Sequence, residues 1–551
     1  MAATMAKPAR ALQKLLGDQA RAAAPDAHVW LSASAGTGKT HVLTARVFRL
    51  LLQGVRPENI LCLTFTKAGA AEMADRIHER LAAWVQMDDP SLFTDLEALG
   101  EPSGPDARDT ARRLFAQVLE STGGGLRIQT IHGFCQQLLT AFPLEADLTP
   151  GFSPLDQREQ SALARESLAD MVVNAQATGD DRLMHALQAI SLRLGEGGAE
   201  QFLLRCAARA DALNDLPDAL GPWLAERLEL PEGDVDQWLA SQCSDEHFDM
   251  RTLAALAAAN ADWGKGRGLE RCDRIAAWRA RDPAGRAATL ADLHRAWAKA
   301  DGDIIDAKGW VPPADGYMAL AARLHDRCAA LLAIKQRADY AALLAQALHA
   351  GRSYARVYAQ AKQLAGAVDF DDLIARAEHL LIQDGIADWI RYKLDQRIDH
   401  ILVDEAQDTN FSQWAIVAAL TAEFFAGEGA KGDKVRTIFT VGDYKQAIFG
   451  FQGTSPEAFR LAQDAFQRHA ATAGHPFFTL SLDRSFRSTP AVLDVVDRLI
   501  ADLGGAALGL EEGAVRHDSE RRHPGEVMLW TPLAAQGNDM ADDEDGGEEG
   551  W

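Results

Sequence analysis

The sequence predicts an α/β fold with a parallel sheet that a large helical insertion interrupts. Short, nearly continuous apolar runs occur near both ends of the chain, at His28–Leu31, Ile60–Phe65, Ile398–Val403, Thr437–Val441 and Phe477–Leu482. Such runs are typical of strands buried on both faces of a parallel sheet. Between the runs, apolar residues recur at helical spacing, as in Glu72–Trp84. This alternation predicts helices layered on the sheet.

The middle of the chain has a different pattern. From about residue 157 to residue 364 it is rich in Ala, Leu and Arg and has few β-type runs. Ser161–Met171 and Tyr340–Ala350 have the pattern of amphipathic or Ala-rich helices. Because strand-like runs lie on both sides, we expect a helical insertion inside one α/β domain.

Length and composition limit the possible classes of protein. The chain has 551 residues and is 47% apolar, which is sufficient for more than one buried core. Its six cysteines form no CxxC pair, so no zinc or iron–sulfur site is indicated. It has no long uncharged apolar run and no signal-peptide pattern, so we expect no membrane association and a reducing, cytoplasmic location.

The formal net charge is −23, which by itself argues against a nucleic-acid partner. The final stretch, Asp539–Trp551, has seven acidic residues and no basic one, so it supplies −7 and leaves −16 for the rest. Binding requires only a local basic track. The charge therefore disfavours tight non-specific duplex binding but is compatible with a narrow single-strand channel.

A phosphate-binding loop follows the first predicted strand. Residues 33–40 read Ala-Ser-Ala-Gly-Thr-Gly-Lys-Thr, the P-loop pattern with Ala in place of the first Gly. Small residues let backbone N–H groups converge on phosphate oxygens, and the next helix adds its N-terminal partial charge. We expect nucleotide contacts from this whole loop, with Lys39 at the β- and γ-phosphates and Thr40 at Mg²⁺. The alternative is a strand–helix turn that binds no ligand.

The cofactor-binding residues predicted by this pattern are Ala33, Ser34, Ala35, Gly36, Thr37, Gly38, Lys39 and Thr40.

A pair of carboxylates ends a later apolar strand, in the sequence Ile-Leu-Val-Asp-Glu-Ala-Gln-Asp-Thr at 401–409. In a P-loop enzyme a strand-end Asp coordinates Mg²⁺, which we assign to Asp404. The adjacent Glu405 is placed to act as general base on the attacking water. The alternative is a solvated acidic loop, but the preceding strand and the upstream P-loop favour a catalytic pair.

These motifs, with several others in the same order, resemble the UvrD/Rep group of superfamily 1 DNA helicases. The similar segments are TFTKAGAAEM at 64–73, TIHGFC at 130–135, DFDDL at 369–373, VGDYKQAIFGFQG at 441–453 and LDRSFRS at 482–488. Within the group, FTKAGAAEM and IFGFQG look most like the AddA branch, although a RecB-type subunit shares this layout. Lys67 and Gln452 depart from the Asn and Arg that many members have.

The resemblance implies roles for further residues. Gln19, before the P-loop, corresponds to the adenine-reading glutamine, Gln446 to the residue that senses the γ-phosphate, and Arg487 to an arginine from a second motor domain. Glu405, Gln446 and Arg487 are thus the expected catalytic set. DNA contacts are expected from Phe65, Thr66, Lys67, Thr130, His132, Phe449 and Phe451. For each aromatic residue among them, ordinary core packing is the alternative.

The family also implies a domain organisation. We expect a RecA-like P-loop NTPase domain in two parts (1–145 and 365–475) around a helical insertion (146–364). The start of a second RecA-like domain (476–536) and an acidic disordered tail (537–551) would follow. The family's TIHxSKGLEF and YVAxTRA motifs are not recognised after Ser488. We therefore expect a fragment, a truncated product or a degenerate copy that hydrolyses ATP slowly and does not unwind DNA by itself.

Two functions of different class follow. The first is an ATP- and Mg²⁺-dependent 3′→5′ translocase of AddA type in double-strand-break repair, acting on single-stranded DNA and DNA ends with an AddB-like partner. The second is an inactive ATP-binding module that docks a partner. A P-loop ATPase unrelated to helicases is a third and weaker alternative, because the motifs occur in the family's order.

Overall fold

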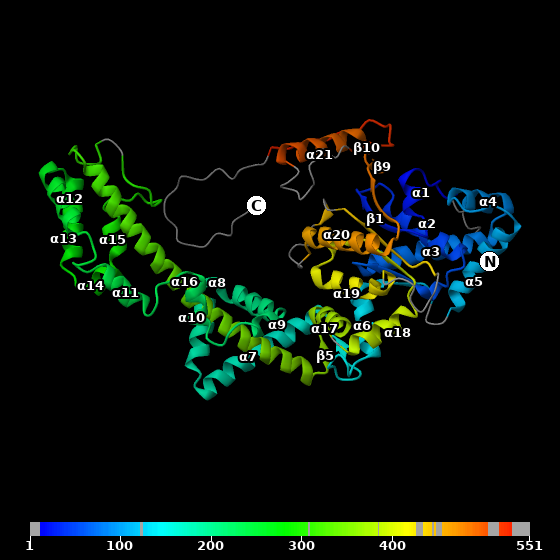
Figure 1. Cartoon of the computed structure of the whole chain (residues 1–551), viewed down its shortest axis with the longest axis horizontal. Coiled ribbons are helices and arrows are strands. Elements are labelled where there is room, and N and C mark those ends of the chain that lie inside the picture. Colours follow the sequence, from blue (N-terminus) through cyan, green and yellow to red (C-terminus); the bar gives the residue numbers. More distant parts are fainter. Residues whose placement is uncertain are drawn as a thin grey trace, which may run out of the picture. The chain divides into compact units, whose positions relative to one another are not determined.

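The computed structural model describes residues 11–121, 125–306, 309–383, 385–425, 434–443, 446–447, 454–504 and 517–531. The chain divides into two compact units (Figure 1). The first contains Met1–Pro150 and Asp372–Trp551, and the second contains Gly151–Asp371. Among the described residues, every helix is too short or too polar to cross a membrane.

A six-stranded parallel sheet forms the centre of the first unit, with strand order β3-β2-β6-β7-β1-β8. Its strands are β1 (His28–Ala33), β2 (Ile60–Thr64), β3 (Arg127–Thr130), β6 (His400–Val403), β7 (Thr437–Gly442) and β8 (Phe477–Leu482). The predicted α/β class and parallel sheet are confirmed. Five of these strands coincide closely with the predicted apolar runs. The edge strand β3, of sequence Arg-Ile-Gln-Thr, is only partly buried and lacks that signal.

Helices cover both faces of the sheet. The helices of this unit are α1 (Asp18–Ala22), α2 (Lys39–Leu52), α3 (Lys67–Gln86), α4 (Asp89–Ala98), α5 (Pro105–Glu120), α6 (Ile131–Ala141), α17 (Phe370–Ile382), α18 (Ile386–Asp395), α19 (Phe411–Thr421), α20 (Pro456–Ala473) and α21 (Pro490–Leu503). Side chains alternate along β1, so Val29 and Leu31 join the core formed with α2, α3 and α5. Trp30 points to the other face, where its ring lies 4.6 Å from Phe459 and 5.3 Å from Trp414 between centroids.

A buried arginine fixes α2 against the sheet. The Arg46 side chain donates to the carbonyl oxygens of Ala22 (3.0 Å) and Ala27 (2.6 Å) and to the Thr437 hydroxyl (2.9 Å). Burial lowers the pKa of Arg46 to about 9. A buried charge requires such partners. Arg46 therefore attaches α2, the helix that begins at Lys39, to the start of β1 and to β7.

The second unit is helical, as the sequence predicted. Two short strands, β4 (Ser153–Pro154) and β5 (Ala367–Val368), pair where the chain enters and leaves it. Its helices are α7 (Gln157–Thr178), α8 (Asp181–Ala207), α9 (Ala210–Asn214), α10 (Leu220–Arg227), α11 (Val235–Gln242), α12 (Met250–Trp263), α13 (Gly266–Arg279), α14 (Pro283–Ala288), α15 (Leu290–His294) and α16 (Tyr317–Leu364).

The 48-residue helix α16 runs past two groups of helices (Figure 1), and a separate core forms at each half of it. The core at its N-terminal half includes Tyr317 and Leu324 and is shared with α11, α12, α13 and α15. The core at its C-terminal half includes Tyr354 and Tyr358 and is shared with α7 and α8. The long helix therefore joins two helical clusters into one unit.

The boundaries of the compact units differ from the domain boundaries expected from the sequence. The helical unit spans residues 151–371, whereas the expected insertion spans 146–364. Strand β8 pairs with β1 along its whole length, although the expected boundary at 475/476 assigns it to a second domain. Pairing of β8 with β1 depends on tertiary contacts, so an apolar run cannot reveal to which sheet it belongs. The functional division of the chain stays a prediction, and its acidic tail lies outside the described residues.

Candidate nucleotide-binding and catalytic site

The P-loop connects the end of β1 at Ala33 to the start of α2 at Lys39. Gly36 and Gly38 have φ angles of 76° and 95°, in the left-handed region that glycine adopts without strain. A Cβ atom at Gly36 would overlap the Cβ of Arg487, and the Gly36 carbonyl accepts from the Phe486 amide at 2.8 Å. Glycine is thus required here both for the turn and for the close approach of residues 486–487.

Two contacts within and around the loop hold it in shape. The Thr37 hydroxyl donates to the Ser34 carbonyl oxygen at 2.7 Å. The Ser34 hydroxyl lies 3.2 Å from Nε2 of His517, whose Nδ1 lies 2.5 Å from a carboxylate oxygen of Asp497. Thr37 is therefore a buried structural residue of the loop, and Ser34 connects the loop to the segment that follows α21.

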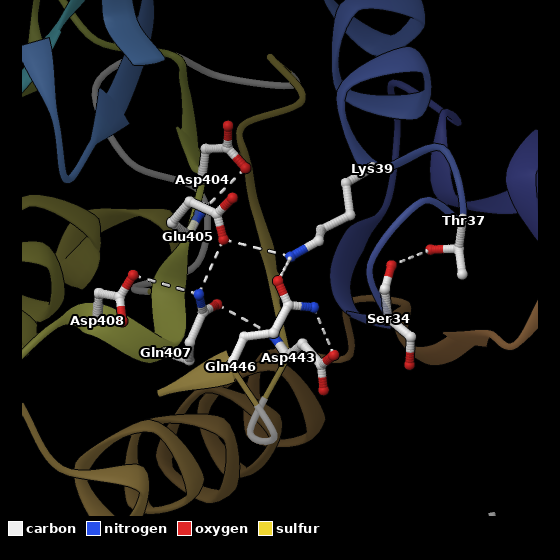
Figure 2. A network of polar contacts seen from close by, with 9 residues as sticks. All are labelled: Ser34, Thr37, Lys39, Asp404, Glu405, Gln407, Asp408, Asp443 and Gln446. Atoms are coloured by element: carbon white, nitrogen blue, oxygen red, sulfur yellow. Dashed lines mark hydrogen bonds and ion pairs between the residues drawn. The ribbon is translucent and has the colours of Figure 1, made fainter. Parts of the chain in front are cut away.

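Lys39 is the centre of a polar network that joins three motifs (Figure 2). Its Nζ donates to Oε2 of Glu405 at 3.2 Å and to Oε1 of Gln446 at 3.5 Å. Gln446 in turn donates to Oδ2 of Asp443 at 2.7 Å. The network thus brings together residues that lie about 400 positions apart in the sequence, because β1, β6 and β7 are neighbours in the sheet.

The two carboxylates after β6 have different surroundings. Burial, and next the charge of Glu405, raise the pKa of Asp404 to about 6. The Glu405 side chain is 44% exposed. Its backbone has φ 49°, a left-handed conformation that non-glycine residues rarely adopt, and its amide donates to Oδ1 of Asp404 at 3.0 Å. This sharp turn directs the Glu405 carboxylate toward Lys39, and no such contact joins Asp404 to that ammonium group.

Gln407 fixes the orientation of Glu405 from behind. Its side-chain amide donates to Oε2 of Glu405 at 2.8 Å, and its carbonyl oxygen accepts from the Asp443 amide at 2.9 Å (Figure 2). A Cβ at Gly442 would lie 2.9 Å from that same oxygen, so glycine leaves the required room. The same Gln407 amide reaches Asp408 at 3.3 Å, and burial raises the pKa of Asp408 to about 6.

A pocket of about 450 Å³ opens at this network. The predicted site residues among its lining are Gln19, Ala35, Gly36, Gly38, Lys39, Thr40, Glu405, Gln446 and Arg487. Ala33, Ser34, Thr37 and Asp404 do not line it. The pocket also contains residues that we did not predict, namely Gln13, His41, Arg76, Phe486 and Arg521. Of these, only His41 and Phe486 are next to a predicted site residue in the sequence. No motif in the sequence around Gln13, Arg76 or Arg521 indicated that they would line the pocket.

The pocket has the features that Mg-ATP requires. Its loop has glycines where side chains would obstruct a close approach, and an ammonium group adjoins the open space. The hydroxyl of Thr40 and the carboxylate of Asp404 are hard oxygen donors of the kind Mg²⁺ prefers. The residues present therefore fit both the nucleotide and the metal.

The candidate DNA-contact residues that the structure describes, Phe65, Thr66, Lys67, Thr130 and His132, lie where β2 and β3 end. These strands pair in register, Thr64 beside Thr130, so the segments that follow them emerge at the same edge of the sheet. Thr66 and Thr130 cap α3 and α6, their hydroxyls accepting from the amides of Gly69 and Gly133, each at 3.0 Å.

Their exposure differs. Thr66 and Lys67 are exposed, Phe65 and His132 are half-buried, and Thr130 is buried. Burial lowers the pKa of His132, which favours its neutral form. Phe449 and Phe451 lie outside the described residues. The DNA roles of all seven candidates stay predictions, and the partial burial of Phe65 is compatible with both base stacking and core packing.

The fold and the pocket together define a P-loop nucleotide-binding protein of the α/β class. Comparison with known families identifies it further, because residues 16–467 match the N-terminal domain of UvrD/REP helicases. The chain belongs to this helicase family.

Curated relatives identify the branch to which the chain is similar. It is 26% identical to the AddA polypeptide of the ATP-dependent helicase/nuclease from Pelotomaculum thermopropionicum, over 87% of this chain and 38% of the relative. The AddA polypeptides from Levilactobacillus brevis and Lactobacillus delbrueckii subsp. bulgaricus are 28% and 27% identical, over 87% and 97% of this chain. The chain spans 38% and 44% of these two relatives.

Proposed function

We propose that this chain is the ATP-driven motor portion of a 3′→5′ DNA helicase or translocase of AddA type that acts in double-strand-break repair. The observation that carries the proposal is the convergence of Lys39, Glu405 and Gln446 within hydrogen-bond distance at one pocket. These side chains come from three separate loops at the carboxyl edge of a parallel sheet, where α/β proteins bind ligands.

Lys39 and the loop before it bind the phosphates in this proposal. The Lys39 ammonium pairs with Glu405 in the structure, and ATP phosphates offer it a denser negative charge. Gln19 reads the adenine with its amide, which can donate to and accept from the base. Thr40 and Asp404 hold Mg²⁺, which supplies positive charge to the β- and γ-phosphate oxygens.

Glu405 serves as the general base. When Lys39 transfers to the phosphates, the Glu405 carboxylate loses its cationic partner and can accept a proton from the attacking water. The hydrogen bond from Gln407 keeps the carboxylate in place during this exchange. The partial exposure of the Glu405 side chain leaves access for water.

Gln446 and Arg487 connect the nucleotide to other parts of the motor. Gln446 contacts both Lys39 and Asp443, the residue that directly follows β7. When a phosphate draws Lys39 away, Gln446 loses one of these two contacts and is free to shift relative to the end of β7. Arg487 follows β8 and packs against Gly36 of the loop. A planar guanidinium at this position can neutralise charge that develops on the γ-phosphate.

The substrates and the partner are also proposals. We assign single-stranded DNA and DNA ends as substrates, with contacts at the β2–β3 edge of the sheet. The relatives' name describes each of them as one subunit of a helicase/nuclease, which implies an assembly of several chains. The partner that we propose for this chain is therefore an AddB-like protein.

The test is nucleotide binding, DNA-dependent ATP hydrolysis and strand displacement on duplexes with 3′ or 5′ single-stranded tails. We expect Mg-ATP binding that Lys39→Ala abolishes, and a preference for the 3′ tail when the AddB-like partner is added. Equal ATP affinity in wild type and Lys39→Ala would disprove the P-loop assignment. ATP binding without any DNA-dependent hydrolysis, even with the partner, would favour the alternative of a docking module.

A further inference from the structure

The segment that carries two of the pocket's glutamines has little regular structure of its own. Residues 11–16 form no helix or strand, and α1 after them is only five residues long. Gln13 lines the pocket, and its carbonyl oxygen accepts from Nε2 of His41 at 3.0 Å. Gln19 lies over the P-loop, where a Cβ at Gly38 would be 3.5 Å from its Nε2. No sheet ladder fixes this segment, so other contacts must set its position.

A completely buried carboxylate on α4 supplies one such contact. Oδ1 of Asp95 accepts from the backbone amide of Leu12 at 2.8 Å. Its Oδ2 accepts from Nη1 of Arg80 at 3.0 Å and from Nε1 of Trp84 at 2.9 Å, both on α3. Asp95 therefore ties the coil directly to two helices, and each of its oxygens is engaged.

The end of α4 and the turn after it supply two more contacts. The Ala98 carbonyl oxygen accepts from the Leu15 amide at 3.0 Å. Glu101 pairs with Nε of Arg49 at 2.7 Å, both side chains being largely buried. Arg49 also donates to the Ala20 carbonyl, next to Gln19, at 3.3 Å. The coil is thus held on both sides of its glutamines by α4 and residues 98–101.

These contacts are strong because of where they lie. A hydrogen bond to a charged group contributes about 1.5–3 kcal/mol, and a buried N–H that loses its partner costs about 1–3 kcal/mol. Movement of the coil toward water would break the hydrogen bond of the Leu12 amide and leave Oδ1 of the buried Asp95 without that partner. The position of Gln13 and Gln19 therefore depends on a carboxylate that is not itself part of the pocket.

We infer that α4 and the turn that follows it form a brace for the base-reading segment, and that Asp95 is a positioning residue for the choice of nucleobase. The inference rests on the proposed function, in which Gln19 reads adenine. A glutamine amide matches the amino group and the ring nitrogen of adenine, and guanine presents a carbonyl oxygen instead of the amino group. Discrimination requires the amide at a fixed place, which the brace provides.

The experiment measures displacement of a fluorescent ATP analogue by ATP and by GTP, with the full chain and without turnover. Asp95→Asn keeps the shape of the side chain but removes its charge and turns one acceptor into a donor. Asp89→Asn, the same exchange at the first residue of α4, is the matched control, because Asp89 binds Arg108 and Arg112 on α5 instead of the coil. Gln19→Ala tests the base-reading assignment itself, and thermal melting reports folding.

We expect Asp95→Asn and Gln19→Ala to reduce the ATP-over-GTP preference by about five- to tenfold, the value of one hydrogen bond. Asp89→Asn should keep the wild-type preference. If Asp95→Asn does not fold, Glu101→Gln serves as the second variant. It weakens the ion pair between Glu101 and Arg49 and should also lower the preference for ATP over GTP. An unchanged preference in folded Asp95→Asn, with loss in Gln19→Ala, would overturn the brace alone. An unchanged preference in Gln19→Ala would overturn the base-reading role on which the brace depends.

Discussion

The turn at Glu405 shows how one residue's backbone can separate the roles of two adjacent carboxylates. Ordinary strand geometry would point Asp404 and Glu405 to opposite faces. The left-handed φ of Glu405 instead brings its carboxylate within reach of Lys39 and Gln407, while desolvation raises the pKa of Asp404. The sequence predicted both residues but not this conformation, because a motif of letters contains no φ angle.

Replacing the proposed general base, Glu405, by a side chain of the same shape should separate ATP binding from ATP hydrolysis. Glu405→Gln keeps the size of the side chain and a contact to Lys39 but cannot accept a proton at neutral pH. We expect near-normal ATP affinity and a loss of kcat of about 10²–10⁴-fold. Filter binding and single-turnover hydrolysis measure the two quantities. Hydrolysis at the wild-type rate would assign the base to another residue.

Gly36 and Gly54 offer a matched pair for testing the phosphate loop. Both have positive φ, so alanine at either position costs about 1–2 kcal/mol of stability. Only at Gly36 would the new Cβ also overlap Arg487, since nothing lies within 4 Å of one at Gly54. Gly36→Ala should therefore weaken ATP binding, whereas Gly54→Ala should lower only the melting temperature. Equal ATP affinity in both variants would contradict the close approach described above.

At the scale of elements, the contact between β1 and β7 includes a buried histidine. His28 begins β1, and its Nδ1 accepts from the Ile438 amide at 3.2 Å. Burial, and then the charges of His475, Arg46 and His400, lower the pKa of His28 to about 3. Protonation would place a hydrogen on Nδ1 opposite that N–H, so the folded state requires the neutral ring.

This histidine should make stability depend on pH. Because its folded pKa lies below the unfolded value of about 6.5, its contribution is complete above pH 6.5 and declines as the pH falls from there toward 3. The expected loss approaches about 1.4 kcal/mol per pH unit. Urea unfolding between about pH 7.5 and 5 should show a smaller pH dependence for His28→Gln than for wild type. The same exchange at the exposed residue His185 is the control, and equal slopes in all three proteins would count against His28.

The edge formed by β2 and β3 carries the prediction for DNA. Lys67 is exposed at the start of α3, where its charge can meet a phosphate. Lys67→Ala should weaken the binding of single-stranded DNA and reduce the slope of log affinity against log salt concentration by about one unit.

Phe65 carries a separate prediction. Phe65→Ala should weaken single-stranded DNA binding by about 1–3 kcal/mol if bases stack on that ring. Fluorescence anisotropy over a range of salt concentrations measures both. Wild-type affinity in folded Phe65→Ala would assign this residue to the core.

The contrast between β1 and α4 explains what the sequence could predict. The strands β1, β2, β6, β7 and β8 are apolar runs whose signal is local, and the P-loop and the DEAQDT segment carry their chemistry in adjacent residues. Asp95 has no such signal, because its partners Leu12 and Arg80 become neighbours only after folding. Arg76 and Arg521 enter the pocket in the same way. Long-range contacts of this kind require the structure.

At the scale of the whole molecule, the nucleotide pocket belongs to one unit alone. The described strands of the main sheet and the residues that line the pocket all lie outside Gly151–Asp371. The chain enters and leaves the helical unit side by side, since the Ser153 amide donates to Gly366 at 3.0 Å and the Leu155 amide to Val368 at 2.8 Å. A short connection can therefore replace the entire unit.

We predict that joining Pro150 to Asp372 through about ten Gly and Ser residues, a flexible length of about 18 Å, leaves ATP binding intact. Independent sites change each other's free energies by only about 0.3–0.5 kcal/mol, so the ATP affinity should stay within about twofold of wild type. Calorimetric titration with Mg-ATP measures the affinity, and circular dichroism should show a lower helical fraction. The Lys39→Ala version of the shortened chain is the control for specific binding. If the shortened chain folds but has lost its ATP affinity, the helical unit contributes to the pocket, and nucleotide binding in this protein depends on both units.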